Sequence, residues 1–337
     1  MMGGRGESMM SRRELLGGAV SAGAFLAAGV AGQAGSALAG GLRERPRSVT
    51  RIVAPRFAQV GEVFKVKRTI PAVSLEDVDP FLMLDNFDFH VGKGELGGLA
   101  PHPHRGFETV TVMNEGEIEH GDSLGNRGKI SSGDIQWMTA GNGIVHEENP
   151  SDALRERGGR VLGVQLWVNL PRAYKKVAPK YQDKVHTQVP TWQEAGVRAR
   201  VYAGKAYGLD AIISTHSPIG LVDYALQPGI STRIEWPSTW SAFVQAVDGM
   251  VTVGGERVGE GHLALTRKDG DHLVLSNESS RPVRFLLGGG EPIGESYASY
   301  GPFVMSTEAE LRESIELYRS GRMGRVENPT YERVRRR

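Results

Sequence analysis

This chain is organised around one segment, Pro101-His102-Pro103-His104-Arg105-Gly106-Phe107-Glu108-Thr109-Val110. Side chains alternate between the two faces of an extended strand, so His102 and His104 face the same side. His146 and Glu148 repeat this spacing later, within the run Gly143-Ile144-Val145-His146-Glu147-Glu148-Asn149-Pro150. Two such pairs on facing strands predict a site of three imidazoles and one carboxylate.

That ligand set suits one divalent first-row metal, and four protein ligands leave positions open on a five- or six-coordinate ion, as in catalytic sites. Glu147 turns to the opposite face, so Glu148 is the expected ligand. A single His-X-His pair is often an ordinary surface or core feature, but two pairs favour a metal site. Glu108 shares the parity of His102 and His104; it is either a fifth ligand or a hydrogen-bond partner of a ligand, and we expect the second.

Composition bounds the remaining possibilities. The 337 residues leave room for two domains, and 45 glycines with 17 prolines predict short strands joined by many turns. Lys plus Arg at 40 nearly balances Asp plus Glu at 39, so we expect no nucleic-acid partner and a small neutral or weakly acidic ligand. The absence of cysteine excludes disulfides, zinc-thiolate sites and cysteine nucleophiles.

The amino terminus has the pattern of an export signal. Ser11-Arg12-Arg13-Glu14-Leu15-Leu16 precedes an apolar run from about Gly17 to Val30, and Ala37-Leu38-Ala39 follows as a small-residue cleavage site. The paired arginines resemble the twin-arginine motif, with Leu15 and Gly17 departing from its usual residues. The apolar run is too short and too rich in glycine for a spanning helix. We therefore expect a signal peptide over residues 1–39, a periplasmic or extracellular protein, and no stable membrane insertion.

The rest of the chain has mainly strand-like patterning. Alternating or β-branched segments between glycine turns predict strands at residues 64–70, 109–112, 117–119, 161–170, 197–203, 219–226, 242–251 and 263–275. The histidines of the second half (His186, His216, His262 and His272) occur singly, which predicts one metal per chain, in the first half. Residues 307–318 have helical spacing after Ser306 or Thr307 as the N-cap, with Leu311, Ile315 and Tyr318 as the buried stripe.

Taken together, these motifs resemble the pirin family. The resemblance rests on the two histidine runs, on Gly133-Asp134-Ile135-Gln136-Trp137-Met138-Thr139-Ala140-Gly141, on Gln165-Leu166-Trp167-Val168-Asn169-Leu170-Pro171, and on Gly290-Glu291-Pro292-Ile293 with Gly301-Pro302-Phe303-Val304-Met305. It implies an all-β fold of two cupin (jelly-roll) barrels in tandem, followed here by a short carboxy-terminal helix. We expect a linker over 40–50, a metal-binding barrel over 51–183, a metal-free barrel over 184–305, and the helix and basic tail over 306–337.

The same resemblance implies a metal, iron in most members and otherwise manganese, nickel, copper or zinc, held by His102, His104, His146 and Glu148. It also implies a quercetinase-like activity, the dioxygen-dependent cleavage of a flavonol or similar phenolic. We expect Glu148 to act as the base and Gln165 to line the pocket or to make a structural hydrogen bond, in a monomer. The alternative is a metal-dependent protein-binding or redox-sensing module without turnover, as in the pirins that act as transcription coregulators; the export signal argues against it.

Overall fold

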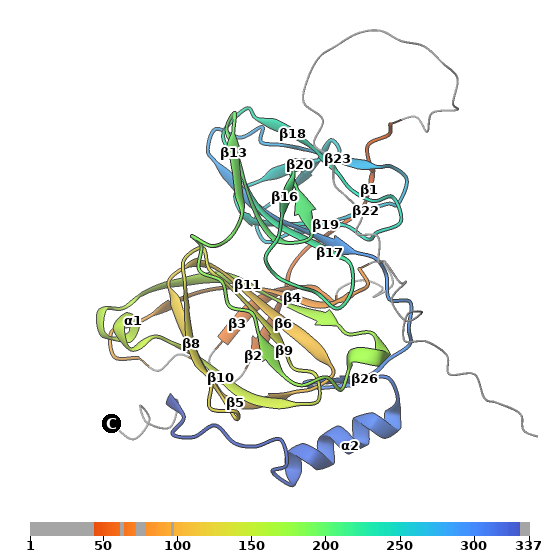
Figure 1. The fold of residues 1–337 in the computed structure, drawn as a ribbon. Helices are drawn as coiled ribbons and strands as arrows, with labels where there is room; N and C mark the ends of the chain where they lie inside the picture. Colours follow the sequence, from red (N-terminus) through yellow and green to blue (C-terminus); the bar gives the residue numbers. More distant parts are fainter. Residues whose placement is uncertain (1–43, 61–63, 72–77, 96–97, 331–337) are drawn as a thin grey trace, which may run out of the picture.

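The computed structural model describes residues 44–60, 64–71, 78–95 and 98–330, and the expected signal peptide lies outside these ranges. Two β-barrels stack against each other, and the larger sheets of the two meet between them (Figure 1). No helix of the described residues is both long enough and apolar enough to span a bilayer. The all-β, two-barrel fold predicted from the sequence is confirmed.

The first barrel closes a seven-stranded sheet against a four-stranded one. In spatial order the larger sheet contains β12 (Lys180–Tyr181), β9 (Ile135–Thr139), β6 (Phe107–Glu115), β11 (Gly159–Asn169), β4 (Phe81–Val91), β3 (Phe64–Ile70) and β2 (Arg56–Val60). The smaller sheet contains β5 (Leu99–His104), β10 (Ile144–Pro150), β7 (Glu117–Asp122) and β8 (Arg127–Ser131). Both histidine runs therefore lie on adjacent strands of the smaller sheet.

The second barrel repeats this plan. Its larger sheet contains β1 (Val49–Val53), β22 (Leu263–Thr266), β19 (Phe243–Asp248), β24 (Val283–Gly290), β17 (Ile219–Leu226), β14 (Val197–Ala203) and β13 (Thr191–Glu194). Its smaller sheet contains β18 (Ser231–Glu235), β23 (His272–Ser276), β20 (Val251–Val253) and β21 (Glu256–Val258). Apolar side chains fill its interior, including Tyr224 stacked on Phe285 with ring centroids 5.1 Å apart.

Alternation along β11 separates the site from the core that joins the barrels. Val164, Leu166 and Val168 are buried in a cluster that also contains Phe243 and Leu286 of the second barrel. The intervening side chains point into the first barrel instead, because successive residues of a strand face opposite sides. This face includes Gln165 and Trp167, which line the pocket described below.

The first and the last described segments each pack against the barrel formed by the other half of the chain. Strand β1 pairs with β22, so the second barrel includes residues before the expected boundary at 51. Arg47 is 1% exposed and donates hydrogen bonds to three carbonyls of the second barrel, so this part of the expected linker at 40–50 is anchored. The linker prediction is wrong for these residues.

The carboxy-terminal segment returns to the first barrel. The hairpin of β25 (Ala298–Tyr300) and β26 (Phe303–Met305) bridges to Arg105, and α2 (Glu308–Arg319) lies beneath that barrel (Figure 1). Thr307 caps the helix as expected, and Leu311 is buried, but Tyr318 is 40% exposed and departs from the predicted stripe. The remaining short elements are α1 (Asp152–Arg157), the 3-10 turn η2 (Arg172–Tyr174), and the pair β15 (Lys205–Ala206) and β16 (Leu209–Asp210).

Candidate metal centre

Three histidines converge inside the first barrel. Strand pairing places His146 opposite His102, and one ligand atom from each of His102, His104 and His146 lies within 4.8 Å of the others. Ring centroids are 4.4 Å apart for His102 and His146 and 4.9 Å for His104 and His146. Among the described residues this is the only group of three or more potential metal ligands. Imidazoles gathered this closely fit a divalent first-row metal.

Unpaired ring nitrogens support the same conclusion. Both ring nitrogens of His146 and Nδ1 of His104 are buried without a hydrogen-bond partner among the described residues. Buried polar atoms are rarely left unpaired, because each costs free energy unless a partner or a metal satisfies it. His102 Nδ1 lies 2.9 Å from the carbonyl oxygen of Ala100; the carbonyl accepts, so Nδ1 carries the proton and Nε2 is free to bind a metal. The residues present therefore fit the expected ion.

Burial keeps two of these rings neutral. It lowers the pKa of His104 well below the usual value, and the nearby His102 lowers it further. Burial is also the main cause of the lowered pKa of His146, with additional contributions from His102, His104 and His120. A neutral imidazole is the form that binds a metal, so the site needs no proton release from these two rings at neutral pH.

Glu148 lies in the barrel interior, as the parity argument predicted, and Glu147 points to the opposite face of the strand, where it is also buried. Glu147 accepts a hydrogen bond from the backbone of Thr330 and lies 3.6 Å from Arg127. The carboxylate of Glu148 is outside the three-histidine group and accepts hydrogen bonds from Gln165 Nε2 at 3.0 and 3.2 Å. Gln165 is thus the residue that holds this carboxylate in position.

Glu108 does not join the site. The chain turns at Gly106, between β5 and β6, where φ has the left-handed value of +86°. The alternation of side chains that applies to His104 on β5 therefore does not extend to Glu108 on β6. Glu108 is 1% exposed, and its carboxylate accepts from Thr139 at 2.7 Å and contacts His216 Nδ1 at 3.1 Å. The expected role beside the ligands is therefore contradicted; Glu108 instead joins the first barrel to the segment before β17.

One buried histidine near the site was not anticipated. His120 pairs in register with Glu148, stacks on Tyr181 with centroids 4.8 Å apart, and contacts Asp183 Oδ2 at 3.2 Å. Burial, followed by the nearby Asp122 carboxylate, raises the pKa of Tyr181. His120 has no second histidine two residues away in the sequence, so only the strand register that sets it opposite Glu148 shows that it lies near the site.

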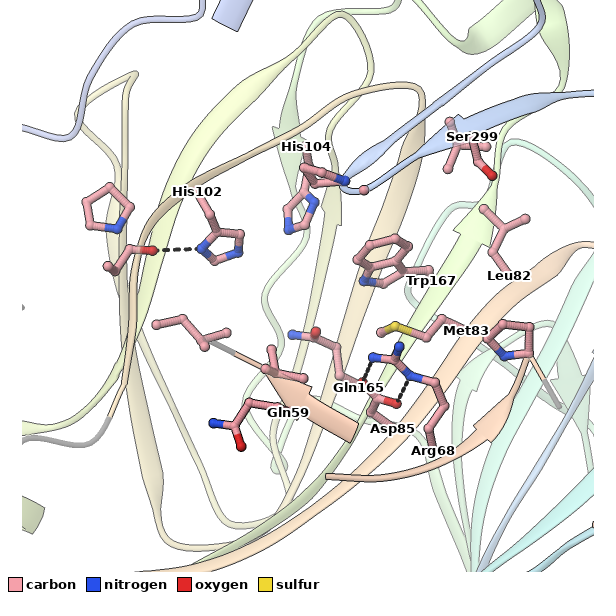
Figure 2. Close-up of a pocket in the computed structure, with 18 of the residues that line it drawn as sticks. Gln59, Arg68, Leu82, Met83, Asp85, His102, His104, Gln165, Trp167 and Ser299 are labelled. Atoms are coloured by element: carbon pink, nitrogen blue, oxygen red, sulfur yellow. Dashed lines mark hydrogen bonds and ion pairs between the residues drawn. The ribbon is translucent and has the colours of Figure 1, made fainter. Parts of the chain in front are cut away.

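A pocket of about 660 Å³ opens onto the histidines. His102 and His104 point into it beside Trp167, while Gln165 and the Arg68–Asp85 pair lie along its other side (Figure 2). The hairpin β25–β26 supplies part of the wall through Ser299 and Val304. This volume and its largely apolar walls are typical of sites for drug-sized ligands.

Two family models match the chain, Pirin over residues 63–168 and the Pirin C-terminal cupin domain over residues 221–324. A pirin-like protein of Solanum lycopersicum is 39% identical over 83% of this chain and 94% of its own length. The chain belongs to the pirin family. The pirin of Mus musculus is 36% identical over 82% of this chain and 94% of its own length. The crystal structure of a quercetin 2,3-dioxygenase from Acinetobacter baumannii aligns with a TM-score of 0.79 at 34% identity, covering 84% of this pirin and 100% of that chain.

Proposed function

We propose that the chain is a metal-dependent dioxygenase that cleaves a flavonol or a similar phenolic. The observation that carries the proposal is the convergence of three histidines, two of which, His102 and His104, line a large, mostly apolar pocket, with His146 buried behind them. Similarity to the quercetin 2,3-dioxygenase of Acinetobacter baumannii supports the same reaction class. The fold alone would not identify the reaction, because related folds host many activities.

The three imidazoles and Glu148 would hold the ion, which we propose to be Fe(II), with manganese, nickel, copper or zinc as alternatives. When bound, such an ion supplies Lewis acidity and redox chemistry toward dioxygen. The chain's own residues position the substrate. Trp167 offers an aromatic wall for a planar ring, and Glu148 accepts the proton from the hydroxyl oxygen of the substrate. Gln165 keeps the Glu148 carboxylate oriented toward that proton through its two hydrogen bonds.

Oxygen uptake with a panel of flavonols and catechols tests the proposal. The iron-loaded protein should consume dioxygen with at least one flavonol, and His104→Ala should abolish the consumption because it removes a ligand. His262→Ala, at a half-buried position of the second barrel, is the matched control and should leave the rate unchanged. Uptake that survives His104→Ala would contradict the proposal, and binding of a protein partner without any uptake would favour the non-catalytic alternative.

We also propose export of a monomer through the twin-arginine route, with Arg12 and Arg13 as the recognised pair. The support is the sequence pattern of residues 11–39 alone. Because that route carries folded proteins, the metal would be acquired before export. Replacing both arginines with lysine should leave the protein in the cytoplasm, whereas unchanged export would refute the route.

A further inference from the structure

Arg68 lies in the pocket with an unused hydrogen-bonding edge. Its Nε and Nη2 donate to the two carboxylate oxygens of Asp85 at 2.7 and 2.6 Å. Among the described residues no hydrogen-bond partner is found for Nη1, and this nitrogen points toward Met83 in the pocket (Figure 2). The Arg68 side chain is 31% exposed, so the free edge is accessible to a ligand.

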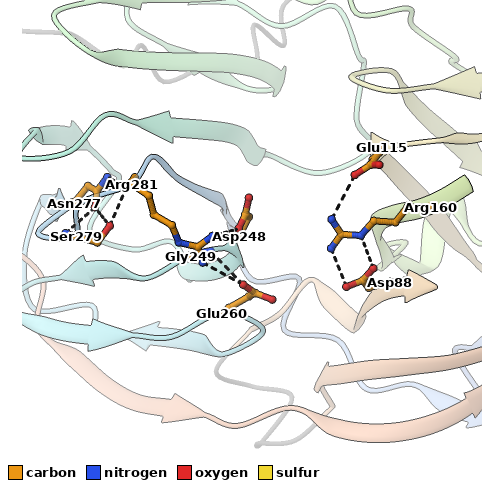
Figure 3. Close-up of polar contacts among 9 residues, drawn as sticks. All are labelled: Asp88, Glu115, Arg160, Asp248, Gly249, Glu260, Asn277, Ser279 and Arg281. Carbon is orange, nitrogen blue, oxygen red and sulfur yellow. Dashed lines mark hydrogen bonds and ion pairs between the residues drawn. The ribbon is translucent and has the colours of Figure 1, made fainter. Parts of the chain in front are cut away.

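A neighbouring ion pair shows what a purely structural arginine does here. Arg160 and Asp88 lie on β11 and β4 and make the same two-pronged contact, with distances of 2.8 and 3.0 Å. The third nitrogen of Arg160 is occupied as well, because Nη1 donates to Glu115 at 3.4 Å (Figure 3). Arg160 faces outward, away from the pocket. The free edge of Arg68 is therefore not a general property of paired arginines in this sheet.

Strand register places Arg68 at a defined distance from the metal ligands. Arg68 pairs with Asp85, and Asp85 pairs with Gln165, which contacts Glu148. Adjacent strands are about 4.8 Å apart, so the backbone of Arg68 lies roughly 10 Å from that of Gln165. A ligand that reached from the histidines to Arg68 would span the pocket.

The chemistry of the free edge defines what it can bind. A guanidinium donates only and stays charged in proteins, so its partner must be an acceptor oxygen, and an ionised oxygen makes the strongest such bond. Asp85 also lines the pocket, but its side chain is only 5% exposed and its two carboxylate oxygens accept from the opposite edge of the guanidinium, so the Nη1 edge is the side of the pair that a ligand can reach. Leu82, Met83 and Trp167 offer apolar contact to the ring system between the two ends.

We propose that Arg68 forms a subsite for an anionic oxygen, phenolate or carboxylate, at the end of the substrate remote from the metal. This inference rests on the proposed function, since it assumes that the other end of the phenolic lies at the histidines. It narrows the substrate class to planar phenolics with an acidic group on a distal ring.

Binding to the metal-loaded protein without oxygen tests the subsite. The probes are 3-hydroxyflavone and its 4′-carboxy derivative, titrated by calorimetry. The acid should bind the wild-type protein about tenfold or more tightly than the neutral flavonol, the range expected of a hydrogen bond to a charged group. Arg68→Lys keeps a cation beside Asp85 but loses the planar guanidinium with its second row of N–H donors. The preference for the acid over the neutral flavonol should then fall to about threefold or less, with the affinity for 3-hydroxyflavone nearly unchanged.

Arg160→Lys is the matched control and should leave both affinities as they are. If Arg68→Lys does not fold, the double variant Arg68→Gln with Asp85→Asn removes both charges together and should likewise abolish the preference. Equal binding of the two probes to the wild-type protein, or a preference that survives these changes, would overturn the subsite. Binding with the expected preference but without oxygen uptake would instead refute the proposed dioxygenase and leave the subsite standing.

Discussion

At the residue scale, the prediction of the metal site depended on the alternation of side chains along a strand. That alternation predicted the facing residues correctly where the strand was continuous. His102 and His104 lie on one strand, and His146 faces them from the next, so i+2 spacing sufficed to bring the rings together. The same rule failed for Glu108, because Gly106 turns the chain between β5 and β6. A glycine that permits a left-handed φ interrupts the alternation, and the sequence alone does not show on which side the next strand resumes.

Glu108→Gln distinguishes the observed role of Glu108 from the predicted one. The amide keeps a hydrogen-bond acceptor for Thr139 but removes the charge beside His216, so the free energy of unfolding should fall by about 1–3 kcal/mol. Metal affinity should not change. Gln165→Leu is the positive control, because it removes the donor that touches Glu148. A tenfold or greater loss of metal affinity in Glu108→Gln, of the size that residues supporting a ligand typically produce, would contradict this assignment.

Burial of His104 and His146 makes the metal-free protein sensitive to acid. Their pKa values are well below the ordinary 6.5, so below about pH 6.5 the unfolded chain gains protons that the folded chain does not bind. Stability is therefore present above that pH and lost as pH falls, by up to about 1.4 kcal/mol per pH unit for each ring. Urea unfolding of chelator-treated protein between pH 7.5 and 5.5 measures this slope.

The double variant His104→Gln with His146→Gln supplies the reference, because it removes both titrating rings and retains the carboxylates that also respond to acid. Its unfolding free energy should fall less steeply with decreasing pH than that of the wild-type protein. Identical slopes for the two proteins would show that these rings do not titrate as proposed.

At the element scale, the sequence predicted strands with clear alternation and missed those without it. Residues 219–226 were expected as a strand and form β17 with those bounds, and the helix capped by Thr307 was also anticipated. Strand β4 was missed although it is eleven residues long, because Phe81-Leu82-Met83-Leu84 faces the core on one side and the pocket on the other. A strand with apolar residues on both faces has no period-2 signal.

The amino-terminal segment before β1 should stabilise the second barrel. Burial lowers the pKa of Arg47 to about 10, and its three donors serve carbonyls that would otherwise be unpaired. Arg47→Met should therefore lower the free energy of unfolding by about 2–4 kcal/mol. Arg45→Met is the control, since the Arg45 side chain is 68% exposed and lies 3.8 Å from Asp269, and it should cost about 0.5 kcal/mol or less. Equal losses in urea unfolding would show that the segment is not anchored through Arg47.

At the scale of the whole molecule, the architecture was predictable and the composition of the pocket was not. The tandem barrels followed from many short strands and from the family resemblance. The pocket, by contrast, combines β3, β4, β5 and β11 with a hairpin more than a hundred residues farther along the chain. Arg68 and Ser299 line the same pocket only because the carboxy-terminal segment returns to the first barrel. Contacts between segments so far apart in the chain produce no periodic pattern in the sequence, so the sequence alone does not predict them.

The central claim is that one metal ion binds in the first barrel between His102, His104 and His146. Anomalous diffraction from crystals of the iron-loaded protein, collected on both sides of the iron absorption edge, tests it most directly. We expect one anomalous peak per chain, within bonding distance of all three imidazoles and of the Glu148 carboxylate. An empty histidine cluster, or a peak located in the second barrel, would contradict the claim.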